Sequence, residues 1–121
     1  MKTPVKLILF LALISSFSCT EVRKNRDTEL YENTAQNRIY DSSTGKPFTG
    51  IGVKEGTSEY ATTIEIKYED GYIEEMKFID SRGKTSIYYK YDEEGNPVGL
   101  IYYDYDGNPV TSDEFHKLRQ K

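Results

Sequence analysis

A glycine recurs every twelve residues in the second half of the chain, and this spacing limits the folds open to the chain more than any other feature. The four glycines are Gly71, Gly83, Gly95 and Gly107. Twelve residues suffice for a strand of ordinary length and one tight turn. Glycine supplies the positive φ that short hairpin loops need. The repeat therefore predicts a mainly β fold, an antiparallel meander of β-hairpins.

The first repeat shows the alternation expected of a strand with one polar face. Ile64, Ile66 and Tyr68 alternate with Glu65 and Lys67. Side chains two residues apart share one face of a strand. This strand should turn its apolar side chains to a core and its charged ones to water.

Tyrosines gather on two later strands of the repeat. The six are Tyr88, Tyr89, Tyr91, Tyr102, Tyr103 and Tyr105. They occupy both faces, so we expect one set to enter the core and the other to form an exposed aromatic strip that binds a protein or a glycan. The alternative is that both sets are covered by the rest of the fold.

The N-terminal segment has the order of a secretory signal peptide over residues 1–18. Lys2 and Lys6 precede the apolar run 7–14, and the lone cysteine, Cys19, follows small residues. This pattern resembles a bacterial lipoprotein signal. The resemblance implies lipidation of Cys19, palmitate included, and an outer membrane lipoprotein on the periplasmic or surface face of the cell envelope. The alternative is a plain signal peptide with an incidental cysteine.

Removal of residues 1–18 takes away Lys2 and Lys6 and changes the net charge from −4 to −6 on the remaining 103 residues. A negative charge argues against nucleic acid as a partner and against electrostatic attachment to a membrane, so the lipid alone would anchor the chain. Residues 19–36 are polar and predict a lipidated tether, and residues 37–121 predict one domain.

The domain should begin with a loose hairpin and end with a helix. Residues 38–40 and 48–54 predict two strands joined by a turn at 41–45. From Thr111 to Lys121 we expect a short helix that covers part of the sheet. Thr111 and Glu114 have the spacing of a capping box, in which each side chain meets the other's backbone N–H.

Two stretches carry a resemblance to repeat families. Tyr40 and the run 45–50 (GKPFTG), followed by a strand ending in YEDG at 68–71, resemble MORN-variant repeats. The runs 91–96 (YDEEGN) and 103–108 (YDYDGN) are similar to the YD repeats of secreted bacterial toxins. These resemblances imply stacked β-hairpins, and the MORN-variant resemblance implies protein interaction or an antitoxin-type role.

The sequence shows no set of catalytic or metal-binding residues. His116 is the only histidine and should be exposed on the helix, and neither Asp104 nor Asp92 begins a run with the Gly and Glu of a calcium loop. We expect no enzyme activity, no metal and no cofactor, and we interpret these aspartates as turn residues. A small hydrolase using Asp104 and Asp106 is a remote alternative.

Together these features predict an envelope-anchored lipoprotein that acts as a non-catalytic protein-interaction module. Its partner would be an envelope or secreted protein. The alternative is an immunity or antitoxin-type protein that binds a toxin and occludes its site, since a net charge of −6 suits a basic target.

Overall fold

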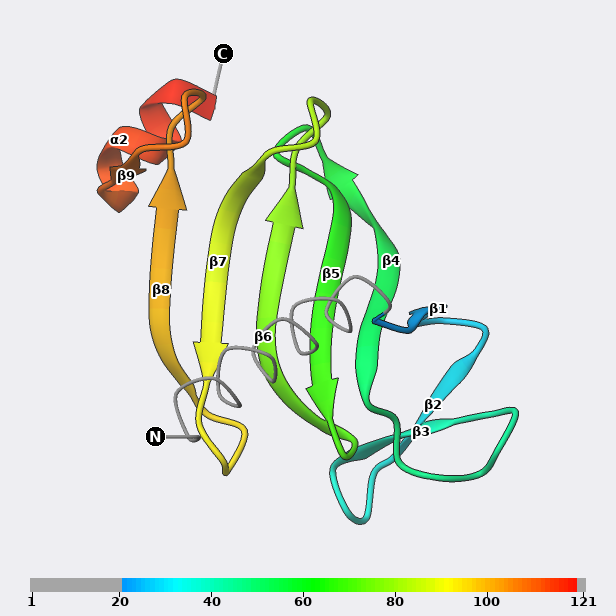
Figure 1. Cartoon of the computed structure of the whole chain (residues 1–121). Helices are drawn as coiled ribbons and strands as arrows, with labels where there is room; N and C mark the ends of the chain where they lie inside the picture. The colour runs from blue at the N-terminus through cyan, green and yellow to red at the C-terminus, as the bar shows by residue number, and fades with distance from the viewer. Residues whose placement is uncertain (1–20, 120–121) are drawn as a thin grey trace, which may run out of the picture.

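The computed structural model describes residues 21–119, which form an open antiparallel sheet with a hairpin at one end and a helix at the other (Figure 1). The sheet has seven strands in the order β1-β4-β5-β6-β7-β8-β9, and a second sheet pairs β2 with β3. The predicted meander is confirmed, because β4 to β9 pair antiparallel in chain order. The elements are β1 (Arg23–Asn25), β2 (Leu30–Asn33), β3 (Arg38–Asp41), β4 (Gly50–Ser58), β5 (Ala61–Glu69), β6 (Tyr72–Ile79), β7 (Thr85–Tyr91), β8 (Pro97–Tyr103), β9 (Pro109–Val110) and α2 (Ser112–Arg119).

The glycines of the twelve-residue repeat all lie in turns with positive φ, between 84° and 89°. Three of these turns also share an aspartate three residues before the glycine: Asp80, Asp92 and Asp104. In each, the Oδ1 atom accepts the N–H groups of the residues two and four positions on, at 2.9–3.0 Å. The interpretation of Asp92 and Asp104 as turn residues is confirmed.

The turn between β5 and β6 is of a different kind. Asp70 and Gly71 both have positive φ, 54° and 87°, as a two-residue type I′ hairpin loop requires. A Cβ at Gly71 would lie 2.6 Å from Cγ of Arg38 and 2.7 Å from the carbonyl oxygen of Ile39. Glycine is therefore needed here both for backbone conformation and for the close approach of β3.

The alternation of β5 sorts its side chains between the two faces of the sheet as the sequence predicts. Ile66 and Tyr68 are 6% and 4% exposed and belong to the main core cluster. On the opposite face Glu65 forms an ion pair with Arg23 of β1. The register with β6 carries the pattern across the sheet, since Ile66 lies opposite Met76 and Glu65 lies opposite Lys77.

At the end of the sheet that holds the β5–β6 and β7–β8 turns, the hairpin β2–β3 covers the apolar face (Figure 1). We call this the hairpin end. Leu30 of β2, Ile39 of β3 and Phe48 are each less than 8% exposed and pack on Ile66 and Tyr68. Burial of each such side chain stabilises the fold by about 1.5–3 kcal/mol.

Two predictions for the N-terminal part are corrected by this arrangement. The tether predicted for 19–36 is wrong for residues 21–36, because β1 pairs with β4 in parallel, β2 pairs with β3, and Leu30 enters the core. Of the hairpin predicted for 37–54, the first strand and the turn are confirmed by β3 and by the N–H groups of Thr44 and Gly45 that donate to the Asp41 carbonyl. Its pairing is corrected, because β3 meets the following segment at the single bridge between Tyr40 and Pro47 and pairs along its length with β2. Residues 21–36 are mostly polar, but Leu30 among them enters the core and thereby fixes the β2–β3 hairpin on the sheet.

At the opposite end, which we call the helix end, α2 lies beside the end of β8 (Figure 1) and packs on the apolar face through Phe115, so it covers part of the sheet as predicted. Thr111 Oγ1 accepts the N–H of Glu114 at 3.2 Å and Glu114 Oε1 accepts that of Thr111 at 3.0 Å, which confirms the capping box. Phe115 is 2% exposed, and its ring centroid lies 5.4 Å from that of Tyr60 and 4.9 Å from that of Tyr102. His116 is exposed, as expected.

Candidate binding groove

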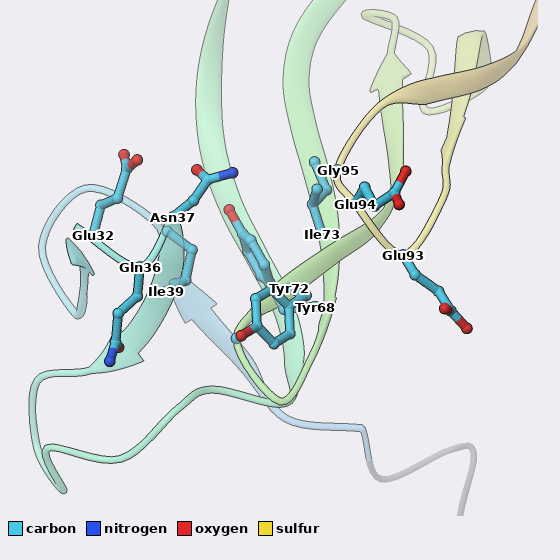
Figure 2. A pocket seen from close by; sticks show the side chains of 11 residues that line it. Glu32, Gln36, Asn37, Ile39, Tyr68, Tyr72, Ile73, Glu93, Glu94 and Gly95 are labelled. Carbon is cyan, nitrogen blue, oxygen red and sulfur yellow. The ribbon is translucent and has the colours of Figure 1, made fainter. Parts of the chain in front are cut away.

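A groove of about 440 Å³ opens at the hairpin end, where three turns of the chain come together (Figure 2). The β2–β3 turn forms one side, the β5–β6 turn forms the floor, and the β7–β8 turn forms the other side. The lining residues are Glu32, Gln36, Asn37, Ile39, Tyr68, Gly71, Tyr72, Ile73, Glu93, Glu94 and Gly95. We call this site the turn groove.

Tyr68 forms the buried part of the floor. It is 4% exposed, and its ring packs edge-on against Phe48 with centroids 6.1 Å apart. Arg26 donates from Nε to the Tyr68 hydroxyl at 3.0 Å. Burial raises the pKa of Tyr68 above its ordinary value, although Arg26 works to lower it. The phenol therefore stays protonated at neutral pH.

Tyr72 forms the exposed part of the floor. It is the first residue of β6 and is 44% exposed. The guanidinium of Arg38 lies over its ring, 4.9 Å from the centroid, and the same guanidinium pairs with Asp70 at 2.6 Å. Tyr72 thus joins an accessible aromatic surface to a cation–π contact that fixes its position.

The rim of the turn groove is acidic. Glu32 lies on one side and pairs with Arg26 at 3.8 Å. Glu93 and Glu94 lie on the other side, in the β7–β8 turn, where both are exposed (Figure 2). Within residues 21–119, neither Glu93 nor Glu94 has an ion-pair partner.

A second hollow of about 290 Å³ continues from the turn groove around Tyr72. It shares Tyr72, Ile73 and Glu93 with the groove. Its other lining residues are Glu69, Asp70, Glu74, Tyr91 and Asp92. Neither lining contains a lysine or an arginine. The guanidinium groups of Arg26 and Arg38 contact the floor tyrosines from outside the two hollows, where they pair with Glu32 and Asp70.

The six tyrosines proposed from the sequence fall into three places, and all are half-buried. By strand register, Tyr89, Tyr91 and Tyr102 share the covered face of the sheet, and Tyr88 and Tyr103 lie on the opposite face. Tyr105 lies in the β8–β9 turn, beyond the end of β8. Its ring lies under two guanidinium groups, those of Arg82 and Arg119, at 4.6 and 4.3 Å.

The sheet therefore brings only part of the tyrosine set together. Tyr89 packs beside Phe78 and Tyr91, with ring centroids 5.6 and 6.4 Å apart, and Tyr91 also lines the second hollow. None of the six lines the turn groove. Cys19, the proposed lipidation site, lies outside the described residues.

Sequence reasoning missed the tyrosines that do line the turn groove. Tyr68 was assigned to the core, and nothing local shows that β3 and the β7–β8 turn meet beside Tyr68 and Tyr72. The available signal was the Asp70-Gly71 dipeptide, which places both rings at one sheet end. The acidic run 92–94, which forms the other side of the groove, was interpreted from the sequence only as part of a turn.

Comparison with models of known protein families, with curated proteins and with solved structures found no match. In the described part of the chain, no helix is long and apolar enough to cross a membrane. The same part contains no group of three His, Cys, Asp or Glu side chains that could hold a metal ion. The geometry of the turn groove is thus the main guide to function.

Proposed function

We propose that the protein is an envelope-anchored lipoprotein that acts as a non-catalytic protein-interaction module, with the turn groove as its binding surface. The observation that carries the proposal is the exposed ring of Tyr72 on the floor of a groove built from three separate turns. Tyrosine is enriched among the residues that dominate binding energy at protein interfaces, because it joins an apolar ring to a polar tip.

The lipid anchor rests on the N-terminal sequence and is tested separately. The chain would be purified from membranes of its source organism and its intact mass measured. We expect an N-terminus at Cys19 with a covalently attached acyl group, and a Cys19→Ala variant without it. An unmodified chain that begins elsewhere would overturn the anchor and leave the binding proposal standing.

The binding surface is tested with the full chain immobilised in detergent and exposed to solubilised envelope of the same organism. We expect one protein to be retained in stoichiometric amount by the wild type and to be lost with Tyr72→Ser. Tyr31→Ser is the matched control, because Tyr31 is also 44% exposed but does not line the groove. The proposal would be contradicted if the wild type retained no protein, or if the retained protein were lost with Tyr31→Ser as well as with Tyr72→Ser.

A second candidate is the immunity or antitoxin-type role, which the acidic rim of the turn groove favours because it suits a basic target. It requires a single partner, bound tightly, whose toxic activity falls to zero in a one-to-one complex. A retained protein whose activity is unchanged by the complex would support the interaction module and exclude this role.

A further inference from the structure

Resting on the proposed function, we infer that the turn groove binds a lysine or arginine side chain of the partner protein. The partner is thereby defined by its chemistry, a cationic head on an apolar stem. Three observations carry this inference. They are the uncompensated charge at the groove, the contacts that the chain's own arginines make with tyrosines and carboxylates, and the apolar residues of the groove floor.

The first observation is the charge left uncompensated on one side of the groove. On the β3 side, Arg26 pairs with Glu32 and Arg38 pairs with Asp70. On the β7–β8 side, Glu93 and Glu94 line the outer rim of the groove, and neither pairs with a cation from residues 21–119. Complementary charge across an interface steers a partner and excludes partners of the wrong sign.

The second observation is that this molecule repeatedly places a guanidinium between a tyrosine ring and a carboxylate. Arg38 lies over Tyr72 and pairs with Asp70. At the helix end, both Arg82 and Arg119 lie over Tyr105 and pair with Asp80.

In the turn groove the same two kinds of group stand open to a ligand. The exposed part of the Tyr72 ring supplies the aromatic surface, and Glu93 and Glu94 supply the carboxylates (Figure 2). The chain itself provides no arginine or lysine among the lining residues. A cation from the partner, placed between the Tyr72 ring and these carboxylates, would form a second arrangement of the kind that Arg38 makes with Tyr72 and Asp70.

The third observation concerns the apolar part of the floor. Ile39 and Ile73 flank the two tyrosines and give the groove an apolar wall below its acidic rim. Lysine and arginine lay their methylene stems along such surfaces while the charged head stays at the polar rim. A free metal ion would gain nothing from this wall, and the described residues offer no three-ligand group to hold one.

The test uses a probe peptide, acetyl-Gly-Arg-Gly-Arg-Gly-amide, titrated into the ¹⁵N-labelled full chain in detergent micelles at low salt. A peptide with citrulline in place of both arginines keeps the shape and removes the charge. We expect the arginine peptide to shift the backbone amide signals of Tyr72, Ile73 and Gly95. The citrulline peptide should leave them in place.

The matched variants carry two substitutions each. Glu93→Gln with Glu94→Gln should weaken binding about tenfold, because each carboxylate contributes a modest attraction that is screened by water. Glu55→Gln with Glu59→Gln removes the same charge from two exposed residues outside the groove and should leave the affinity unchanged. Equal weakening in both variants would show attraction to net charge only and would overturn the inference.

Other outcomes also decide the matter. Equal shifts with the citrulline peptide, or larger shifts at the β8–β9 turn than at Tyr72, would overturn the assignment of a cation to this groove. Failure of the arginine peptide while Tyr72→Ser still abolishes envelope capture would leave the interaction module intact and refute only the chemistry of its partner. Failure of both experiments would refute the proposed function as well.

Discussion

The two ends of the sheet cover the same apolar face by different means. At the hairpin end, Leu30, Ile39 and Phe48 pack on the sheet through apolar contacts. At the helix end, Phe115 is the large apolar side chain that is fully buried, and the ion pairs of Asp80 with Arg82 and Arg119 hold α2 in place beside it. Both ends contain ion pairs, but the carboxylate side chains of Glu32 and Asp70 at the hairpin end are 44% and 65% exposed, whereas that of Asp80 at the helix end is buried. The hairpin end therefore depends mainly on apolar burial, and the helix end depends on apolar burial and on buried ion pairs together.

The two ends also differ in how they use one particular carboxylate. At the helix end, Asp80 is 3% exposed and is bound by Arg82 and Arg119, so its charge serves the fold. At the hairpin end, Glu93 and Glu94 take part in no ion pair of the described residues and rim a groove. The β6–β7 and β7–β8 turns share the same aspartate turn motif, but only the former also uses its aspartate in ion pairs among the described residues.

The largest expected effect breaks the cover at the helix end. Phe115→Ala should lower the free energy of unfolding by about 4 kcal/mol, because it removes a fully buried ring and leaves a cavity. Leu30→Ala should cost about 3 kcal/mol at the hairpin end. Urea unfolding measures both, and hydrogen exchange should show that Phe115→Ala opens α2 and β8 before the rest.

The control for this prediction is His116→Ala, which changes an exposed neighbour on the same helix and should stay within about 0.5 kcal/mol of the wild type. A cost below 1 kcal/mol for Phe115→Ala would mean that the helix contributes little to the stability of the sheet.

The next effect concerns the charge of Asp80. Asp80→Asn keeps the acceptor for the turn N–H groups but leaves the buried Arg119, whose side chain is 5% exposed, without its counter-charge. Loss of one partner of a buried ion pair is costly, and we expect about 3 kcal/mol at pH 7. Thermal or urea unfolding of the two proteins gives the difference.

The same substitution should also change how stability depends on pH. Burial works to raise the pKa of Asp80, but N–H donors from Lys84 and Arg82 and the two guanidinium groups prevail, and its pKa lies below the ordinary value. The stabilising contribution is therefore complete above about pH 4, the unfolded value, and is lost as pH falls through the folded pKa. The wild type and Asp80→Asn should converge in acid, and a constant difference would contradict this account.

A smaller effect compares two glycines with almost the same φ. Gly71 at the hairpin end and Gly83 at the helix end have φ of 87° and 84°, so an alanine at either position is strained by about 1–2 kcal/mol. Only at Gly71 would the added Cβ also meet other atoms within 4 Å. Gly71→Ala should therefore cost about 1–2 kcal/mol more than Gly83→Ala in urea unfolding. Equal costs would show that β3 moves aside freely.

The smallest effect concerns the ion pair at the hairpin end. Asp70→Asn keeps a residue that accepts positive φ and removes the charge that faces Arg38. Because the Asp70 side chain is 65% exposed, the loss should be below about 0.5 kcal/mol. A loss comparable to that of Asp80→Asn would erase the contrast between the two ends.

The parts of the fold that were predicted from the sequence are those that nearby residues decide. The turn glycines, the alternation of Ile64, Ile66 and Tyr68 and the capping box at Thr111 all depend on contacts within a few positions in the chain. The pairing of β2 with β3 was missed, because Leu30 and Tyr31 are the only large apolar neighbours in a polar stretch. Their strand partner is decided by the packing of Leu30 on Ile66 and Tyr68 of the large sheet.

The binding surface predicted from the sequence and the groove that we propose as the binding surface lie in different places. Aromatic residues of the repeat were expected to meet a partner, and the six proposed tyrosines stand half-buried on both faces and under α2. The turn groove uses Tyr68 and Tyr72 instead. Its walls come from segments some sixty residues apart, from Glu32 to Glu94, a distance over which periodicity carries no information about contact.

The sequence by itself determined that this chain forms hairpins, because a glycine that must adopt positive φ every twelve residues leaves the backbone few other conformations. Only the tertiary structure decided which turns meet, which carboxylates are neutralised and which remain open. Those outcomes depend on the order of strands across the sheet and on two covering elements, whose docking follows from the burial of Leu30 at one end and Phe115 at the other.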